Sequence, residues 1–181
     1  AMMVETGEAD ACITGLTKDY GKSIIPSLQV IGTEDGVKRV SSMYIIQHKK
    51  GPFFFADTTV NIDPTAEEMV EIIGLKARFP NLLIDGEMQA NVALSPQLLQ
   101  EHYGFSPLAE KGANTLIFPN VESANIAYKV LQEIGGAEVI GPVLMGMRKP
   151  VHILQLGASV RDIVNMTAIA VVDAQMGSKA L

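Results

Sequence analysis

The stretch VHILQLGASVRDIVN, residues 151–165, predicts a strand end, a loop and the start of a helix. Ser159 stands just before a run with helical spacing, and Asp162 follows three residues later, which is typical of a capping box. The free N–H groups at such a helix start also form a site for an anion. The loop before the helix, LQLGA, carries neither a cation nor a hydroxyl group. Two interpretations stay open: a phosphate site that has lost its chemistry, or a well-capped helix.

The composition around this stretch limits the class of protein. Of 181 residues, 48% are hydrophobic and 19% charged, which predicts a packed globular core in one domain or two small lobes. The formal net charge of −6 argues against non-specific nucleic-acid binding, which needs a basic surface. No apolar run approaches the roughly 20 residues of a membrane span. Cys12 is the only cysteine, so no internal disulfide forms, and we expect a protein of the reducing cytoplasm.

Apolar runs typical of strands alternate along the chain with amphipathic runs typical of helices, which predicts an α/β fold with a mostly parallel sheet. The runs at 40–47 and 51–60 are separated by a short Gly-Pro turn and should form an antiparallel hairpin. The first helical run has no cap and ends at Gly7, so we expect a piece of a longer protein. Further strands are predicted at 9–16, at the start of 81–95 and at 114–120, and helices at 23–32, 63–74, 95–104, 121–136 and 159–174. The segment 138–154 is a glycine-punctuated apolar stretch.

Two of the predicted helices carry informative residues. Pro26 suits the first turn of the helix at 23–32, because proline lacks the N–H group that is unpaired there. Asn120 is predicted to cap the helix at 121–136, and a ligand contact by Asn125 is the second interpretation of this segment. The apolar residues of that helix lie on one side, as in a core-facing helix: Ile126, Val130, Leu131 and Ile134.

Few residues suggest chemistry by their spacing. His48, His102 and His152 lie in separate elements, so we do not expect a metal site. Cys12 stands in an apolar strand and is expected to be a small buried hydrophobe rather than a nucleophile. These residues indicate structure and no reaction.

Three polar segments leave their role open. Asp57-Thr58-Thr59, at 57–59, ends a predicted strand, where open α/β sheets bind ligands, but a plain turn fits equally well. Asp85 and Glu87 share a face if the chain is extended there, as an acid/base pair would, whereas Asp85-Gly86 also suits a turn. Lys111 precedes a strand and could meet a phosphate, although a solvated lysine is the commoner case.

Several stretches, taken in order, resemble the phosphate acetyltransferase family over nearly the whole chain. The segment RVSSMYIIQHKKGPFFFADTTVN, residues 39–61, is most similar to the phosphotransacetylase-like C-terminal domain of multidomain NADP-dependent malic enzymes. The other stretches are GEADACITGL (7–16), LQVIGT (28–33), GPFFFADTTVNIDPTAEEM (51–69), LLIDGEMQANVAL (82–94), ANTLIFPNVESANIAYKVLQEIGGAEVIGP (113–142), KPVHIL (149–154) and SVRDIVNMTAIAVVDAQ (159–175).

The resemblance implies a two-lobed α/β fold of the phosphotransacetylase and isocitrate–isopropylmalate dehydrogenase type, with mostly parallel sheets flanked by helices. One lobe would comprise 40–147, and the other would be built from 1–39 and 148–181 with its N-terminal half absent. The family has a long segment where only about 74–77 connect two elements here, so we expect a deleted or unobserved segment and a break in the chain within 73–78. The resemblance also implies a homodimer and a cleft that binds acetyl-CoA.

The resemblance also implies that the catalytic positions are degenerate. Active members have a Ser-Arg pair before the last helix, which aligns with Gln155-Leu156, and an Asp that is retained as Asp162. A further family arginine aligns with Ile25, and a family cysteine with Thr58. Two cations that would neutralise phosphate are therefore lost. The remaining candidates for contact with an effector are Thr58, Asn120, Asn125, Ser159 and Asp162.

The function implied is regulatory rather than catalytic. The chain would bind acetyl-CoA as the effector of a malic enzyme that converts malate to pyruvate and CO2, with NADP and a divalent metal bound by domains outside this sequence. Regulation of this kind requires different affinities in two conformational states. Two alternatives are a working phosphate acetyltransferase and a structural dimerisation module. No bound metal, nucleic acid or membrane partner is expected for this chain.

Overall fold

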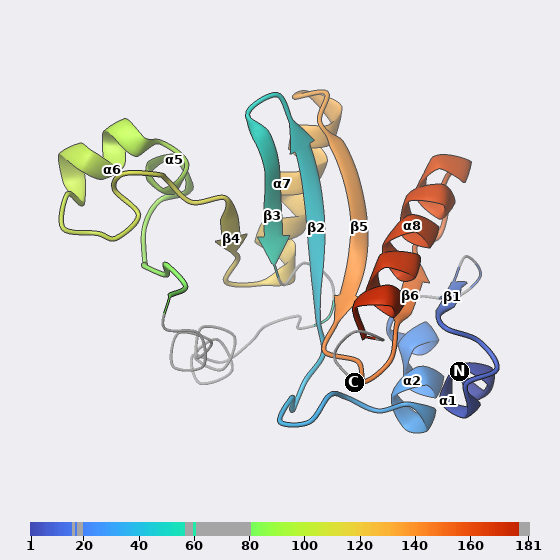
Figure 1. Ribbon diagram of the computed structural model, residues 1–181. Helices are drawn as coiled ribbons and strands as arrows, with labels where there is room; N and C mark the ends of the chain where they lie inside the picture. Colours follow the sequence, from blue (N-terminus) through green and yellow to red (C-terminus); the bar gives the residue numbers. More distant parts are fainter. Residues whose placement is uncertain (16, 18–19, 57–59, 61–80, 178–181) are drawn as a thin grey trace.

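The fold is seen in a computed structural model, which describes residues 1–15, 17, 20–56, 60 and 81–177. Figure 1 shows a central sheet, with the N-terminal elements and the last helix on one side of it and residues 81–113 on the other. No described helix is long and apolar enough to span a membrane. In chain order the elements are α1 (Met2–Thr6), β1 (Cys12–Gly15), α2 (Tyr20–Val30), β2 (Ser41–His48), β3 (Gly51–Ala56), α5 (Ala90–Ala93), α6 (Pro96–His102), β4 (Thr115–Ile117), α7 (Val121–Glu133), β5 (Glu138–Met145), β6 (Val151–Leu154) and α8 (Val160–Gly177).

The smaller sheet joins strands from opposite ends of the chain. β1 and β6 run parallel, and Gly15 pairs with Leu154 at their carboxyl ends. Alternate residues of β6 face opposite sides of this sheet. Val151 and Ile153 share a buried cluster with Ile24 of α2, whereas Leu154 packs in a cluster with α8. One face of the sheet is therefore covered by α2 and the other by α8.

The larger sheet has the strand order β4-β3-β2-β5 and mixed pairing. β2 runs antiparallel to β3 and β5, whereas β3 and β4 run parallel. The predicted hairpin and the α/β fold class are confirmed. α7 covers one face through a buried cluster of Tyr44, Ile46, Phe55 and Tyr128. The rings of Tyr44 and Tyr128 stack with centroids 4.1 Å apart.

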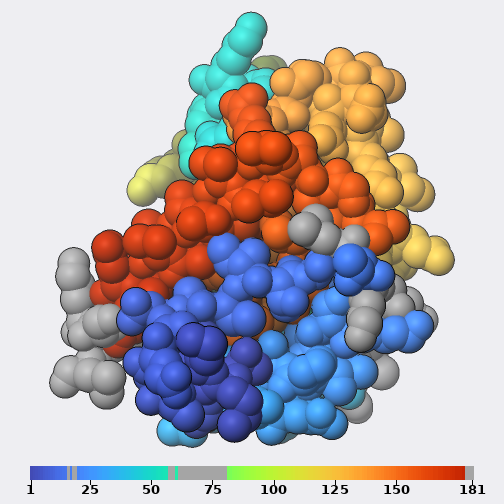
Figure 2. All heavy atoms as spheres, turned by 90° about the vertical axis from the view of Figure 1, so that its right-hand side faces the viewer, coloured from blue at the N-terminus to red at the C-terminus, as the bar shows by residue number. Residues whose placement is uncertain are grey.

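α8 packs against both sheets. Met166 of α8 is almost completely buried in a cluster with Val143 of β5 and Leu154 of β6. Ile13 of β1 and Ile45 of β2 pack at the edge of the same cluster. The opposite face of α8 lies open across the surface in Figure 2, above the N-terminal elements. α8 therefore packs across both sheets and joins them through one buried cluster.

Two predictions about local structure are wrong. Pro26 lies inside α2 and not in its first turn, because the helix is already formed at Tyr20 and buries Ile24 in the core. No strand forms at the start of 81–95, where Leu82 and Leu83 are exposed. An apolar run becomes a strand only beside a partner strand, and β4 pairs with β3 alone in the described sheet.

The orientation predicted for α7 is also wrong. The apolar stripe of Ile126, Val130 and Ile134 faces outward, and Ile134 is 84% exposed. The helix buries Ala124 and Tyr128 instead, because the large ring of Tyr128 stacks on the sheet. The predicted helix at 63–74 and the expected break within 73–78 lie outside the described residues.

Candidate functional site

The loop between β6 and α8 lies at the carboxyl ends of two parallel strands. Ligands of open α/β sheets bind at such ends. Gly15 ends β1 beside Leu154 and has a φ of +120°, a conformation that favours glycine. A Cβ atom at Gly15 would overlap the backbone of Leu154. The close approach of these two strand ends therefore requires glycine at this position.

The start of α8 is a complete capping box. The Ser159 amide donates to the Asp162 carboxylate at 2.7 Å, and the Ser159 hydroxyl donates to the same oxygen at 2.8 Å. The Asp162 amide in turn donates to Ser159 Oγ at 3.2 Å. Both amides are thus satisfied by side chains of the chain itself. The carboxylate of Asp162 stands where an anion would otherwise interact with the helix start.

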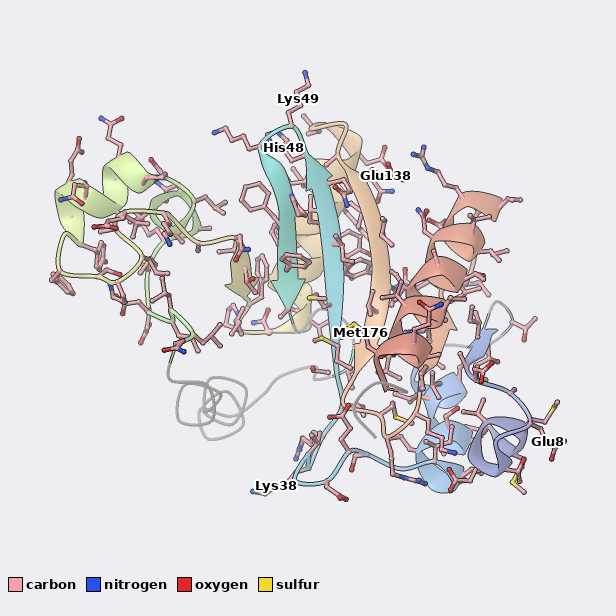
Figure 3. The ribbon with its side chains drawn as sticks, in the orientation of Figure 1. Glu8, Lys38, His48, Lys49, Glu138 and Met176 are labelled. Carbon is pink, nitrogen blue, oxygen red and sulfur yellow. The ribbon has the colours of Figure 1, made fainter. Side chains whose placement is uncertain are left out.

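The loop itself offers no cation. Gln155 and Leu156 are exposed, and Leu156 shows 74% of its surface to solvent. The first turn of α8 carries Arg161, which the sequence analysis did not single out although it stands two residues after Ser159. Its guanidinium donates to Glu138 of β5 at 2.8 Å and is therefore already paired. Figure 3 shows Glu138 at the end of β5 that lies beside the start of α8.

A second group of predicted site residues follows β3 and β4. Asn120 caps α7, since its Oδ1 accepts from the Ser123 amide at 2.9 Å. The Ser123 hydroxyl donates back to the Asn120 carbonyl at 2.9 Å. The cap prediction is confirmed, and Asn125 is half-buried farther along the same helix. Thr58 lies outside the described residues.

The described residues do not bring these two groups together. Glu138, beside the start of α8, pairs in register with Gln47. Asn120 follows β4, whose last residue pairs with Ala56 at the other end of the hairpin. The two groups therefore lie at opposite ends of the larger sheet, as Figure 1 shows for the start of α7 and the start of α8. Ile25 lies on α2 and is 50% exposed.

The remaining candidates have local roles. His48 accepts from the Lys50 amide in the hairpin turn at 3.2 Å. Asp85 accepts from the Gly86 amide at 2.9 Å. In the part of the chain that is described, no group of three His, Cys, Asp or Glu side chains could hold a metal ion. His152 differs from these residues because it is completely buried, and it lies beside α8.

The sequence matches the family described as "Phosphate acetyl/butaryl transferase" over residues 1–79 and 75–171. It is 38% identical to an NADP-dependent malic enzyme of Salmonella typhimurium, with 97% of this chain and 28% of that protein aligned. It is 32% identical to a phosphate acetyltransferase of Thermoanaerobacterium thermosaccharolyticum, with 96% of this chain and 67% of that protein aligned.

Solved structures give the same relationship. The fold is similar to that of the EutD phosphotransacetylase from Staphylococcus aureus, with a TM-score of 0.79 and 26% identity over 97% of this chain and 65% of that one. The alignment with the Salmonella enzyme is 216 residues long, more than the 181 residues of this chain, so that enzyme has residues without a counterpart here. The two family matches meet at 75–79, outside the described residues. The chain belongs to the phosphate acetyl/butaryl transferase family.

Proposed function

We propose that this chain is a regulatory phosphotransacetylase-like domain of an NADP-dependent malic enzyme, which binds acetyl-CoA and does not transfer the acetyl group. The observation that carries the proposal is the loop between β6 and α8. Gln155 and Leu156 are exposed there, at the carboxyl ends of two parallel strands. The family resemblance implies that active members carry a hydroxyl group and a guanidinium at these two positions.

The chemistry of the loop argues against acetyl transfer. A transferase must stabilise negative charge on phosphate and on the developing oxyanion, and a guanidinium does this well. Leu156 has no charge, and Arg161 is already paired with Glu138. The working transferase is therefore the less favoured alternative.

The distance between the two groups of candidate site residues limits the shape of a ligand that could contact both. Gln47 pairs with Glu138 of the first group, and Met43 pairs with Ala56, beside the end of β4 that leads to the second group. Between Gln47 and Met43, β2 rises by roughly 13 Å, at about 3.3 Å per residue. One ligand that contacts both groups must therefore be extended, and acetyl-CoA is an extended molecule. The catalytic reaction of the longer protein, decarboxylation of malate with NADP and a divalent metal, would take place on domains outside this chain.

Calorimetry on the 181-residue chain tests the binding proposal. Acetyl-CoA should bind with a saturable heat, while release of CoA in the presence of phosphate stays at the level of the buffer alone. Leu156→Arg serves as a matched variant, and it should remain inactive because Gln155 and Ile25 are still changed. Transacetylase turnover comparable to that of ordinary enzymes, by this chain or by the longer protein, would refute the proposal.

The longer protein tests the regulatory part of the proposal. Its malic activity should change on addition of acetyl-CoA, and that response should be lost when the segment corresponding to residues 1–181 is removed. A response that persists without this segment would place the effector site elsewhere. Calorimetry without any heat of binding would favour the structural module.

One observation favours self-association as a second candidate function. The stripe of Ile126, Val130 and Ile134 on α7 is exposed, and contiguous exposed apolar surface often marks an interface. The Tyr44, Ile46 and Phe55 side chains of the β2–β3 hairpin are not part of this surface, because they are buried under α7. Sedimentation velocity should show a dimer that Val130→Glu weakens and Lys129→Glu leaves unchanged. A monomer at high concentration would contradict this candidate.

A further inference from the structure

A cavity of about 480 Å³ lies between the C-terminal half of α8 and strands β5 and β6. Its volume is within the range of small-molecule sites. Its walls are mainly apolar and include Met145, Met147 and Met176, whose flexible thioethers adapt to different shapes. Figure 3 shows Met176 near the end of β5 that is farthest from Glu138. The cavity therefore lies at the opposite end of α8 from the capping loop.

The polar residues of the cavity are acidic. Glu34 and Asp173 both line it, and no lysine or arginine is among the described residues of its walls. The side chain of Asp173 is 51% exposed. Two carboxylates beside an apolar wall suit a ligand with a positive charge and a hydrocarbon body. They disfavour an anion, because like charges repel each other.

The side chain next to Asp173 is His152, which is buried and gives the carboxylate no positive partner. The imidazole is completely buried, and neither ring nitrogen forms a hydrogen bond with the described part of the chain. Its Nε2 lies 3.6 Å from Asp173 Oδ2, which is too long for a good hydrogen bond. Burial lowers the pKa of His152, and the Asp173 carboxylate opposes that shift. At neutral pH the imidazole is therefore neutral and supplies no positive charge beside the Asp173 carboxylate.

We propose that this cavity binds a small aliphatic amine. The ammonium group would lie on the Asp173 carboxylate, with Glu34 as a second acidic group at the wall. The hydrocarbon chain would pack on the methionines of β5 and α8. The inference stands apart from the acetyl-CoA proposal, because it uses the other end of α8 and a ligand of opposite charge.

Methyl NMR on the 181-residue chain tests this site. With methionine labelled by 13C in its methyl group, pentylammonium should shift the signals of Met145, Met147 and Met176 in a saturable way. Met2 and Met3, on α1, do not line the cavity and serve as internal controls. Pentanoate has the same hydrocarbon chain and should bind at least tenfold more weakly. Pentanoate that binds as tightly as pentylammonium, or no saturable shift, would overturn the proposal.

Two variants assign the charge. Asp173→Asn should weaken pentylammonium binding at least fivefold, because it removes the carboxylate and keeps the shape of the side chain. Asp35→Asn is the matched control, since Asp35 is exposed, follows Glu34 and does not line the cavity. A salt titration on the native chain provides a measurement without a variant, and affinity should fall as NaCl rises. Equal affinity in Asp173→Asn, or no dependence on salt, would contradict the role of Asp173.

Discussion

The two ends of α8 differ in whether the nearby polar groups have partners. At its start, Ser159 and Asp162 bond each other, and Arg161 is paired with Glu138. Near its end, the buried ring of His152 has no hydrogen bond within the described chain, and Asp173 faces no cation on the cavity wall. The start of the helix is complete without a ligand, whereas the other end gains from one. The difference indicates that a ligand site is better located by buried polar groups without a hydrogen-bond partner than by the place of a loop in the family's fold.

The largest expected effect is on the strand ends that carry the capping loop. Gly15→Ala would place a Cβ atom on the Leu154 backbone at a positive φ. We expect a loss of about 3 kcal/mol in the free energy of unfolding, from overpacking and backbone strain together. Urea denaturation measures it. Gly7→Ala, also at a positive φ but with nothing within 4 Å of the new Cβ, should cost only about 1 kcal/mol. Equal costs in the two variants would show that the contact with Leu154 is unimportant.

The second effect tests the unsatisfied end of α8. Because the pKa of His152 is lowered in the folded state, the unfolded chain binds the proton first as pH falls. Stability is therefore fully present above the ordinary histidine pKa of about 6.5 and declines below it, by at most about 1.4 kcal/mol per pH unit. Unfolding by urea between pH 7.5 and 5 should show this slope. His152→Gln should flatten the slope, while His102→Gln, at an exposed position, should retain it.

The third effect tests the satisfied end. Ser159→Ala should destabilise the chain by about 1 kcal/mol, because the Asp162 amide loses its acceptor. Asp162→Ala should cost a similar amount. The double variant should cost less than the two single variants added together, since each partner bonds the other. A double-mutant cycle in thermal unfolding measures this coupling, and full additivity would argue against the capping box.

The smallest effect is expected for the ion pair beside the cap. Arg161→Ala removes the contact to Glu138, but the guanidinium is largely exposed. Exposed ion pairs contribute about 0.2–1 kcal/mol and weaken with salt. The difference between native and variant stability should therefore shrink when NaCl is raised. A loss above this range that is insensitive to salt would mean that Arg161 also holds α8 in place.

The outcomes separate local from distant determinants. The cap of Ser159 and Asp162, the Asn120 cap and the hairpin follow from residues a few positions apart, so the sequence predicts them. The buried side of α7 does not, because it depends on Tyr128 meeting Tyr44, 84 residues away. The same holds for the exposed Leu82, which has the apolar character of a strand residue but no partner strand among the residues that the structure describes.

The candidate site divides in the same way. The absence of a cation in the loop of Gln155 and Leu156 can be read from the sequence, since the two residues are adjacent. The cavity is not, because His152 stands alone in the sequence and meets Asp173 only when α8 folds back along β6. No spacing rule links a strand residue to the far end of the helix that follows it. A buried histidine without hydrogen bonds is recognised only once its surroundings are known.

The parallel pairing of β1 with β6 also has a consequence for synthesis. Cys12 pairs with Val151, so the smaller sheet cannot form until most of the chain has been synthesised and has left the ribosome. In the described part of the chain, the last strand residue of the larger sheet is Met145, so this sheet can be completed earlier. Contacts so far apart in sequence form slowly, and chains that wait with open strand edges are prone to aggregate. A newly made chain is therefore most vulnerable before β6 emerges, and a slow stretch of translation after residue 154 would give that sheet time to close.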